Sequence, residues 1–383
     1  MQRVVLYIDS LKIGGAERVT LSFARWLRQN GWTPIVLTRQ SGDMDFYPTP
    51  SGVERVIEPP EPRWLHLLGR WGFLWRVQRL RRWLYQQRVG LAIGMTTKPS
   101  VKLLLACRPL NIPCAVSERN FPPLKRMALP WGVLRRISYP WAALHIVQTR
   151  ATGEWLRRNL AAEPQLLLPN PVQWPQPVFE PQVNPASWLT DAGVPDDAPL
   201  LLAAGTKSHQ KGFDRLVRAF ALLVQRGISV HLVILGLTTD KYHGVNQQQS
   251  LCRLLKRQPL ARRQLHFPGR VGNMSNWYQR ATLFTFPSRY EGFPNVLLEA
   301  MAEGCCCVAS DCPQGPSDLV EDGQNGVLLH SRAGAREWAE VMLDLLASPD
   351  KRHSMQLQAL KVRERYSDSA LQGEFIRAME QLV

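Results

Sequence analysis

Apolar and polar positions at the start of the chain predict a strand, a loop and a helix. Residues 4–8 form a short apolar run, which is typical of a buried strand. The polar loop DSLKIGGAER follows, and residues 17–30 then predict an amphipathic helix that ends at Gly31. A second apolar run, TPIVLT, comes next. This order is typical of a parallel βαβ unit, whose ligands bind at the carboxyl ends of the strands.

A proline-rich stretch separates this pattern from a second one of the same kind. Residues 169–199 contain eight prolines, a composition typical of a connection between domains. Strands are then predicted at PLLLAAGT, SVHLVILG, QLHFPG, LFTFPS and CCVAS, with helices at residues 213–225, 247–257 and 276–280 and from residue 295. Helices from residue 335 onward close the chain. The sequence therefore predicts an α/β protein with two consecutive domains, each built on its own parallel sheet.

The bulk composition agrees with two such domains. A chain of 383 residues is too long for one hydrophobic core. It contains no apolar run near the roughly 18 residues that a membrane-spanning helix needs, and MQRVVLYIDS is not expected to act as a secretion signal. The seven cysteines, which include the run 305–307, lack the spacing of zinc ligands. We expect buried free thiols in a protein of the reducing cytoplasm.

The net charge of +16 is concentrated in one part of the chain. Residues 62–153 contain sixteen lysines and arginines but a single acid, Glu118, whereas the remainder holds 31 basic and 30 acidic residues. Within this block, the segment RWLHLLGRWGFLWRVQRLRRWLYQQR interleaves tryptophans and arginines. A block this basic predicts an anionic partner, such as phosphate groups, an acidic membrane surface or nucleic acid. The alternative is that the tryptophans belong to the core and the arginines form a solvated rim.

Two glutamates, Glu291 and Glu299, lie eight positions apart in PSRYEGFPNVLLEAMAEG. Pro294 suits the first turn of a helix, where its missing amide hydrogen is not needed. Glu291 is therefore predicted in the loop before this helix, and Glu299 within its early turns. Both glutamates would border the same helix start.

That helix start is a predicted anion site, because free amides and the helix dipole favour a group such as a diphosphate. The amides predicted to be free are those of Gly292, Phe293 and Asn295. A diphosphate repels carboxylates, so the two glutamates are better placed to accept hydrogen bonds from hydroxyls on either side of it. A nucleotide sugar offers ribose on one side and hexose on the other. The alternative is a pair of solvated helix carboxylates.

A second motif, AAGTKSHQKGFDRLVRAF, places Lys207 and Lys211 between the end of a predicted strand and a helix. Lysines at such a turn can neutralise a departing diphosphate, which is a large electrostatic contribution when a nucleotide is the leaving group. The alternative is ordinary surface charge.

These two motifs, together with VASDCPQGPSDLVEDGQNGVLL and the N-terminal GGAERV, resemble the retaining glycosyltransferases of family 4 over most of the chain. The resemblance implies the GT-B fold, in which two Rossmann-like domains face a central cleft. The acceptor-binding domain would span residues 1–172 and the nucleotide-sugar-binding domain residues 173–360. A C-terminal helix over residues 361–383 would pack back on the first domain. The segment SERNFPPLKRMALPWGVLRRISYPW is similar to enzymes that extend lipid-linked oligosaccharides or build bacterial surface polysaccharides.

The resemblance also implies a role for each matching residue. Glu291 would hold hydroxyls of the transferred sugar, Glu299 would bind the ribose, and Lys211 would contact the diphosphate. The other donor-binding positions are Gly14, Gly15, Thr206, Arg270, Val271, Gly292, Phe293, Pro294, Asn295 and Val296.

Two positions depart from the family pattern. Thr206 stands where the family usually has an arginine, and Lys207 supplies a charge one position later without the bidentate fork of arginine. Arg119 stands where many relatives carry a histidine that contacts the donor sugar.

We assign Glu291, Lys211 and Lys207 to catalysis.

The implied reaction retains the anomeric configuration and requires no metal ion or other cofactor, because lysines and amides neutralise the diphosphate. The acceptor hydroxyl would attack from the face that the diphosphate leaves, and a diphosphate oxygen would take its proton. The expected donor is a UDP-linked hexose or N-acetylhexosamine.

The expected acceptor is a saccharide linked to polyprenyl diphosphate, reached by a cytoplasmic protein bound peripherally to the inner face of the cytoplasmic membrane. Residues expected to contact the acceptor or the membrane are Arg70, Arg76, Arg79, Arg82, Arg119, Arg135 and Arg136. Two other functions stay open. A GT-B sugar-nucleotide epimerase gives no reason for the basic block, and a single-stranded nucleic-acid-binding protein would bind in a strongly salt-dependent way.

Overall fold

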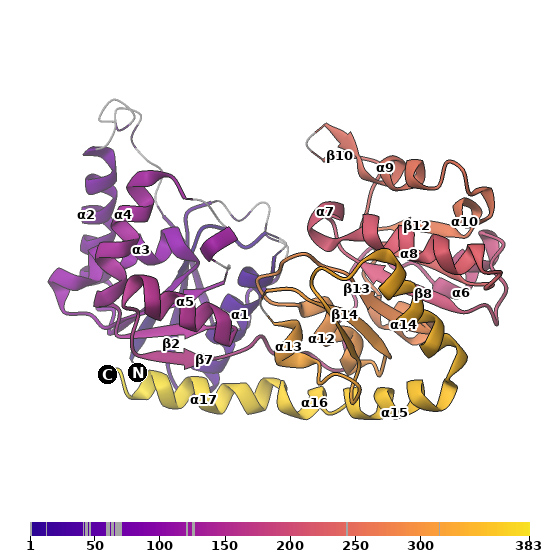
Figure 1. The fold of residues 1–383 in the computed structure, drawn as a ribbon. Helices are drawn as coiled ribbons and strands as arrows, with labels where there is room; N and C mark the ends of the chain where they lie inside the picture. The colour runs from indigo at the N-terminus through magenta and orange to yellow at the C-terminus, as the bar shows by residue number, and fades with distance from the viewer. Residues whose placement is uncertain are drawn as a thin grey trace. The chain divides into compact units, whose positions relative to one another are not determined.

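The computed structural model forms two compact units (Figure 1). It describes residues 2–12, 14–40, 42, 45, 47–58, 62, 65, 71–119, 122–124, 127–242, 244–313 and 315–383. Unit 1 comprises Met1–Pro171 and Asp368–Val383, and unit 2 comprises Val172–Ser367. The chain therefore passes from one unit to the other twice. The C-terminal helix was predicted over residues 361–383, packed on the first domain. Only residues 368–383 belong to unit 1, and residues 361–367 belong to unit 2.

Unit 1 contains a parallel sheet of seven strands in the order β3-β2-β1-β4-β5-β6-β7. The strands are β1 (Arg3–Ile8), β2 (Thr33–Thr38), β3 (Glu54–Ile57), β4 (Leu91–Met95), β5 (Cys114–Glu118), β6 (Leu144–Val147) and β7 (Gln165–Leu167). The strand order reverses between β1 and β4, as in a Rossmann fold.

Helices cover both faces of this sheet, because successive side chains of a buried strand point to opposite faces. On β1, Val4, Leu6 and Ile8 pack against α1 (Gly15–Gln29) and α17 (Asp368–Glu380). Val5 and Tyr7 share the opposite core with residues of α2 (Trp71–Gln86), α3 (Thr97–Cys107) and α5 (Arg150–Leu160). A further helix, α4 (Leu129–Ser138), lies against α3 (Figure 1).

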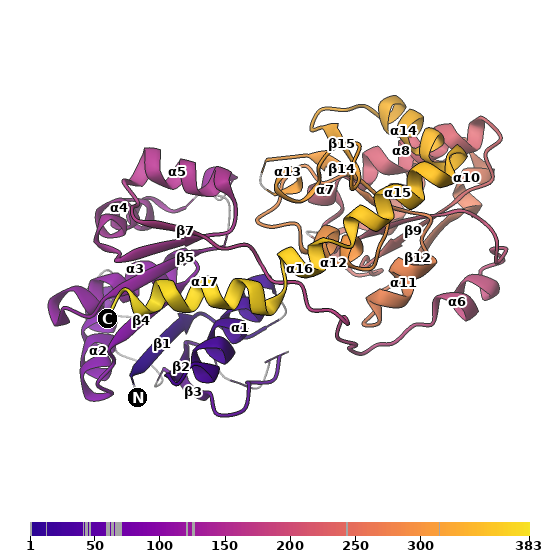
Figure 2. The same cartoon turned by 90° about the horizontal axis from the view of Figure 1, so that it is seen from below.

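Helix α17 completes the core of unit 1 beside α1 (Figure 2). Its Phe375 ring stacks on Phe23 of α1 with the ring centroids 4.2 Å apart. At the start of α17, the carboxylate of Asp368 accepts hydrogen bonds from Arg25 at 2.6 Å and from the Trp26 indole at 2.8 Å. The last helix in the sequence therefore belongs to the unit that the first strand begins.

Unit 2 repeats the architecture with six parallel strands in the order β12-β9-β8-β13-β14-β15. These are β8 (Leu200–Ala204), β9 (His231–Leu235), β12 (Leu265–Gly269), β13 (Leu283–Phe286), β14 (Cys307–Asp311) and β15 (Val327–His330). A separate antiparallel pair consists of β10 (Lys241–Tyr242) and β11 (Val245–Asn246). The expectation of two Rossmann-like domains is thus confirmed.

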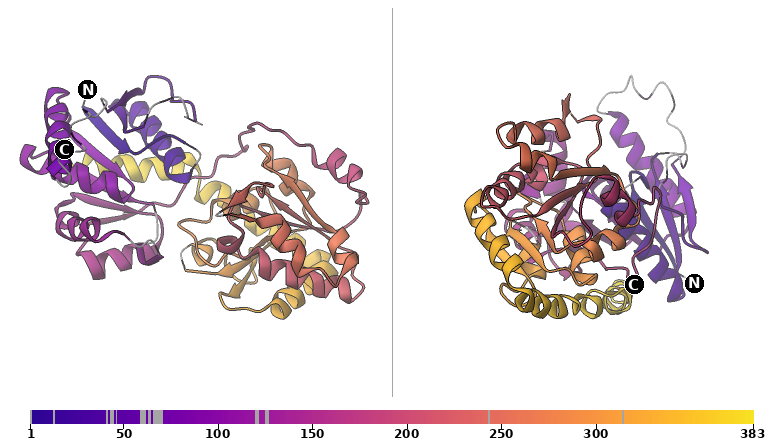
Figure 3. Two further views of the ribbon diagram at one scale, coloured as in Figure 1. Left: turned by 90° about the horizontal axis from the view of Figure 1, so that it is seen from above. Right: turned by 90° about the vertical axis from the view of Figure 1, so that its right-hand side faces the viewer.

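Helices also cover both faces of the sheet in unit 2 (Figure 3). One core contains residues of α8 (Phe213–Gln225), α9 (Gln247–Leu254), α10 (Pro259–Arg263) and α14 (Ala335–Ala347). The other contains residues of α6 (Pro185–Asp191), α11 (Met274–Arg280), α12 (Asn295–Ala302), α13 (Pro316–Leu319) and α16 (Val362–Arg365). Helices α7 (Ser208–Lys211) and α15 (Pro349–Ala359) complete the unit. Cys305, Cys306 and Cys307 are buried and free, as predicted.

The chain passes from unit 1 to unit 2 within the proline-rich stretch, between Pro171 and Val172, but most of this stretch is part of unit 2 and not a free connection. Val172, Leu189, Val194 and Ala198 all lie in the core of this unit. The backbone amide of Val172 also donates a hydrogen bond to the carbonyl of Tyr366 at 2.8 Å. Proline content did not reveal that this stretch contains α6 or which of its apolar side chains are buried.

Two histidines form a buried pair in unit 2. Nδ1 of His231, which begins β9, lies 3.0 Å from Nε2 of His266 on the neighbouring strand β12. Burial lowers the pKa of His266 to about 4, with a smaller contribution from His231. Burial also lowers the pKa of His231, followed by the charge of Arg280. Both rings are therefore neutral in the folded protein at neutral pH.

We predict that the free energy of unfolding of unit 2 decreases as the pH falls from about 6.5 toward 4. In this window the unfolded chain binds protons at these histidines and the folded chain does not, so stability is lost on acidification. His266→Gln should reduce the pH-dependent loss by about 1–3 kcal/mol, measured by hydrogen exchange of the β8 and β9 amides. The matched control is the exposed His353→Gln. Equal pH dependence in the wild type and His266→Gln would contradict the prediction.

Candidate functional site

The two predicted motifs of unit 2 converge on one edge of its sheet. Strands β8 and β13 are neighbours, as the pairing of Leu201 with Leu283 shows. The strand order reverses between them, and open α/β sheets bind ligands at the carboxyl ends of strands at such a reversal. The loop after β8 carries Thr206 and Lys207 and leads into α7, and the loop after β13 leads to Glu291 and α12.

Lys211 and Glu291 form an ion pair at this edge. Nζ of Lys211 donates a hydrogen bond to Oε1 of Glu291 at 2.7 Å. The hydroxyl of Ser288 donates to the same oxygen at 2.6 Å, and the lysine ammonium lies 5.1 Å from the centre of the Phe286 ring. The residue Glu291 is only 7% exposed, so this charge-assisted bond is little weakened by water. The predicted catalytic lysine and glutamate thus lie in direct contact.

Two glycines allow the loops to approach this closely. Gly212 has a φ of 66°, and a Cβ atom there would lie 1.9 Å from the carbonyl oxygen of Pro287. At Gly205, a Cβ atom would lie 2.7 Å from Cγ of Lys211. Any side chain at Gly212 would therefore push the turn of Lys211 away from the loop of Glu291.

Arg289 ties the same two segments together. Its guanidinium binds the carboxylate of Asp214 at 2.7 and 2.8 Å and the carbonyl of His209 at 2.6 Å. Its backbone amide donates to the carbonyl of Gln210 at 2.8 Å. Burial acts to raise the pKa of Asp214, but the hydrogen bonds and the charge of Arg289 hold it below its ordinary value. This bidentate pair fixes the position of Lys211 relative to Glu291.

The exposed Lys207 is held through its backbone neighbours. The side chain of Gln247, the first residue of α9, accepts a hydrogen bond from the Ser208 amide at 2.7 Å. It donates another to the Thr206 carbonyl at 3.0 Å, so it brackets Lys207 on both sides. The sequence analysis missed Gln247, Ser288, Asp214 and Arg289. Ser288 and Arg289 lie inside the motif of Glu291 and Asp214 inside the motif of Lys211, whereas Gln247 lies outside both motifs.

The start of α12 differs from the prediction by one residue. Pro294 is the N-cap and not the first helical residue, with φ −84° and ψ 63°. These angles are those of an inverse γ-turn, in which the Asn295 amide donates to the Phe293 carbonyl at 3.0 Å. The prediction of a free Asn295 amide is therefore wrong. Glu299 is half-buried within α12, as predicted, and its carboxylate lies 3.5 Å from the Tyr278 hydroxyl.

The remaining predicted donor positions lie at strand ends or helix starts. Gly292 is half-buried and Phe293 buried in the loop before α12, and Val296 lies in its first turn. Arg270 is exposed and Val271 half-buried directly after β12.

In unit 1, Gly14 directly precedes α1 and Gly15 begins it. A Cβ atom at Gly14 would lie 2.1 Å from Oε2 of Glu17. Whether these glycines contact a donor stays a prediction.

The basic block of unit 1 places part of its charge on the surface of α2. Arg82 is exposed and Arg76 and Arg79 are half-buried, whereas Arg70 lies outside the described residues. The guanidinium of Arg79 lies 5.1 Å from the centre of the Trp75 ring. These residues line a cavity of about 240 Å³ together with Trp83, Lys102 and Glu58. Trp75 and Trp83 are half-buried, so α2 presents tryptophans and arginines on one open face.

Helix α4 adds an apolar stripe to unit 1. Leu129, Val133 and Ile137 follow at intervals of four residues and are 81%, 49% and 51% exposed. Arg136, between the last two, is exposed as predicted. The Phe73 ring of α2 meets the Trp131 ring of α4 edge-on at 5.4 Å, so the two helices adjoin. Exposed apolar positions next to basic residues are typical of a membrane-contacting surface.

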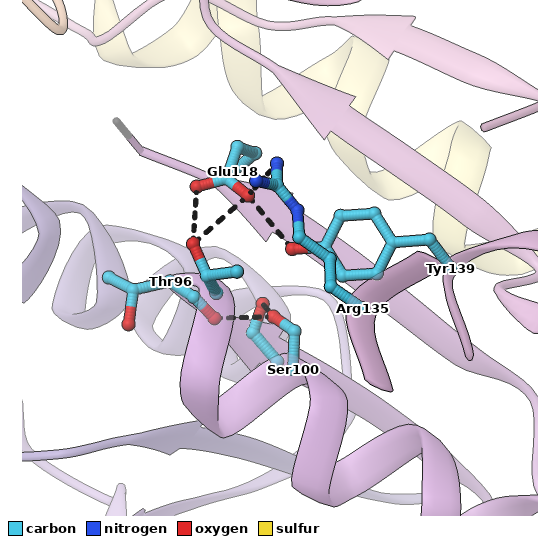
Figure 4. Close-up of polar contacts among 7 residues, drawn as sticks. Thr96, Ser100, Glu118, Arg135 and Tyr139 are labelled. Carbon is cyan, nitrogen blue, oxygen red and sulfur yellow. Dashed lines mark hydrogen bonds and ion pairs between the residues drawn. The ribbon is translucent and has the colours of Figure 1, made fainter. Parts of the chain in front are cut away.

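Arg135 is buried, which contradicts its prediction as a surface contact. It donates a hydrogen bond to Glu118 at 3.0 Å, and the same carboxylate accepts from Tyr139 at 2.8 Å and Thr97 at 3.0 Å (Figure 4). Burial raises the pKa of the Tyr139 hydroxyl, and the Glu118 charge adds to this. The one acid of the basic block is buried, so it requires a buried cation. Arg119 is also buried, so it is not a contact of the membrane surface, and its contact with the acceptor stays a prediction.

Two kinds of feature are absent from the described part of the chain. No group of three or more His, Cys, Asp or Glu side chains is placed there to hold a metal ion. None of its helices combines the length and hydropathy needed to span a bilayer.

Two family models match the chain in succession. Glycosyltransferase Family 4 matches residues 13–173, and Glycosyl transferases group 1 matches residues 187–362. The chain is 32% identical over 181 residues to D-inositol 3-phosphate glycosyltransferase of Xylanimonas cellulosilytica. The matched residues are 45% of this chain and 40% of that protein. It therefore spans two fifths of the length of this curated relative.

Two further comparisons extend over more of the chain. Lipopolysaccharide core biosynthesis mannosyltransferase LpcC of Rhizobium leguminosarum is 26% identical over 279 residues, which is 72% of this chain and 70% of that protein. The crystal structure of Anabaena HepE in complex with UDP superposes with a TM-score of 0.79 at 19% identity and covers the whole of both chains. The fold is therefore shared along the entire chain.

We predict strong energetic coupling between Lys211 and Glu291, because each leaves a buried charge unpaired when the other is replaced. A double-mutant cycle with Lys211→Met and Glu291→Gln should give about 1–3 kcal/mol, from hydrogen exchange of the β8 and β13 amides. The control cycle uses Lys351→Met and Asp344→Asn, an ion pair 47% and 57% exposed. It should give less than about 1 kcal/mol, and equal coupling in both cycles would be evidence against the first.

Proposed function

Because this chain belongs to the glycosyltransferases of family 4, which have the GT-B fold, we propose that it transfers a sugar from a UDP-linked donor to a lipid-linked saccharide. The product is a bacterial surface polysaccharide or a related glycan. The relative LpcC is named for lipopolysaccharide core biosynthesis, and the HepE structure contains UDP. Both names support this class of donor and product.

The observation that carries the proposal is the Lys211–Glu291 ion pair at the carboxyl ends of β8 and β13. The lysine ammonium has three hydrogens, so it can bind Glu291 and a diphosphate oxygen at once. Glu291 keeps further lone pairs for hydroxyls of the transferred sugar. Glu299, the fifth residue of α12, binds the ribose. A nucleic-acid-binding protein would have no use for this buried pair.

The proposed reaction needs no side-chain base. The acceptor hydroxyl attacks the anomeric carbon on the face from which the diphosphate departs, so the configuration is retained. The bond from the anomeric carbon to the diphosphate oxygen breaks as the bond to the acceptor oxygen forms, and the hydroxyl proton passes to the departing oxygen. Lys211 and the exposed Lys207 balance the charge that develops on the diphosphate, so we propose that no metal ion takes part.

For the acceptor side we propose a saccharide on polyprenyl diphosphate, bound where unit 1 is basic and aromatic. Arg76, Arg79 and Arg82 of α2 supply cations for a diphosphate or for anionic lipid headgroups. The apolar stripe of α4 supplies side chains that can enter the interface of a bilayer. The protein is therefore proposed to act at the inner surface of the cytoplasmic membrane.

We predict that Lys211→Ala and Glu291→Ala each lower the rate of UDP release at least about 100-fold, because the first removes a charge that balances the departing diphosphate and the second removes the carboxylate that holds the sugar hydroxyls. The assay uses a panel of UDP-hexoses and UDP-N-acetylhexosamines with a lipid-linked saccharide extract. Lys351→Ala and Glu340→Ala, exposed charges of the same unit, should turn over like the wild type. EDTA should leave the rate within about twofold. Normal turnover by either site variant would refute the assignment.

A second prediction concerns the membrane surface. Replacing Leu129, Val133 and Ile137 together by serine should weaken binding to vesicles containing anionic lipid at least about tenfold, because apolar burial is lost. Cosedimentation with the vesicles measures this. Leu260→Ser with Leu357→Ser, at exposed positions of unit 2, is the control. Unchanged binding by the triple variant would show that α4 does not contact the bilayer.

A further inference from the structure

Three neighbouring strands of unit 1 end in buried polar side chains. Arg119 directly follows β5, Gln148 directly follows β6, and Asn170 comes three residues after β7. These strands are adjacent and parallel, so their carboxyl ends meet at one edge of the sheet. The three residues are only 7%, 5% and 2% exposed. We call them the Arg119 cluster.

Hydrogen bonds join the members of this cluster. Nη1 of Arg119 donates to Oδ1 of Asn170 at 3.0 Å, and the Gln148 amide donates to the same oxygen at 2.6 Å. Nε of Arg119 donates to the Ser117 hydroxyl at 2.7 Å. The guanidinium carbon lies 5.0 Å from the centre of the Phe23 ring. Nη2 has no hydrogen-bond partner among the residues that the structure describes.

The charge of Arg119 is not neutralised by a hydrogen-bonded acid. The oxygens that accept its hydrogen bonds belong to a hydroxyl and an amide. The neighbouring Glu118 carboxylate is bound to Arg135, Tyr139 and Thr97. Burial lowers the pKa of Arg119 to about 9, against an opposing contribution from Glu118, so the guanidinium is still charged at neutral pH. Two buried cations therefore share one buried anion.

A buried cation without an anionic partner costs stability, and an unsatisfied nitrogen adds to that cost. Both costs are removed when a bound anionic ligand pairs with the cation and accepts a hydrogen bond from the unsatisfied nitrogen. The position of the Arg119 cluster agrees, because ligands of parallel sheets bind at the carboxyl ends of the strands. A guanidinium also matches the geometry of carboxylate and phosphate oxygens.

We propose that the Arg119 cluster binds an anionic group of the acceptor, either the carboxylate of an acidic sugar or a phosphate of the lipid carrier. The inference rests on the proposed function, because it identifies the chemistry of the acceptor. Nη2 of Arg119 donates to the anion, while Gln148 and Asn170 hold the guanidinium in place. Arg119 is then a residue that selects charged acceptors over neutral ones.

The test measures binding to the full chain by titration calorimetry at fixed ionic strength. The carboxylate arm compares glucuronate with glucose, and the phosphate arm compares farnesyl diphosphate with farnesol. The variants are Arg119→Gln, which removes the charge, and Arg119→Lys, which keeps it without the fork. Arg158→Gln, an exposed arginine of the same unit, is the matched control. Circular dichroism and thermal unfolding establish that each variant folds.

The wild type should bind one anionic probe at least about tenfold more tightly than its neutral counterpart, the expected value of a charge-assisted hydrogen bond. The arm that shows this preference identifies the source of the anion. Arg119→Gln should abolish the preference, Arg119→Lys should reduce it, and Arg158→Gln should retain it. If Arg119→Gln does not fold, the wild-type and Arg119→Lys comparisons decide.

Equal binding of charged and neutral probes by the wild type in both arms would overturn the inference, as would an unchanged preference in Arg119→Gln. The proposed function is tested separately by UDP binding. The wild type and Arg119→Gln should bind UDP equally, because Lys211 and Glu299 lie in unit 2. A wild type that binds no UDP would contradict the proposed function and not the anion site.

Discussion

The contact between the Lys211 ammonium and the Glu291 carboxylate holds together the functional edge of unit 2. It joins the loop after β8 to the loop after β13, two segments 80 residues apart in the sequence. Gly212 allows the approach, Ser288 shares the carboxylate, and Arg289 fastens the flanking backbone. Both side chains are largely buried and their neighbours hold them in place, so the two charges are in position before any ligand binds.

The electrostatics of unit 1 differ from those of unit 2, because basic residues outnumber acidic residues in the basic block of unit 1. Its basic block has only Glu118 to satisfy its buried arginines, and that carboxylate is fully engaged. Among the described residues of the block, Arg82 and Arg136 are exposed on α2 and α4, Lys102 is buried beside Glu58, and Arg119 is buried without a carboxylate that accepts its hydrogen bonds. A unit with such an excess is poised to bind anions, whereas unit 2 pairs its functional lysine internally.

Hydrophobic periodicity predicted the first two strands and the first helix of unit 1 and five strands of the sheet in unit 2, whereas β3 to β7 and β15 were not predicted. Residues 213–225 were predicted as a helix and form α8 with the same ends, because a strong apolar face lies between turns at Gly212 and Gly227. The motifs also brought Lys211 and Glu291 to one site. Sequence spacing could not show that Asn295 closes a γ-turn, which depends on the backbone angles of Pro294, or that Gln247 brackets Lys207, which depends on the contact of two distant segments.

Charge counting failed for a related reason. A block of like charges identifies a basic region but not the face of a helix on which each residue lies. Arg135 and Arg136 are adjacent in the sequence, yet one is bound to Glu118 in the core and the other is exposed. Proline content marked the boundary at Pro171 but not its extent, because buried apolar side chains of residues 172–198 join the core of unit 2.

The return of the chain to unit 1 at residue 368 has a consequence for biosynthesis. Phe23 and Trp26 are synthesised before unit 2, but Phe375 and Asp368, which pack on them, are synthesised after it. Unit 2 is a continuous segment, so it can fold as soon as it has emerged. During translation, α17 therefore cannot cover the apolar face of α1 until unit 2 has been synthesised. Until then, the exposed apolar surface of the nascent chain favours aggregation and chaperone binding.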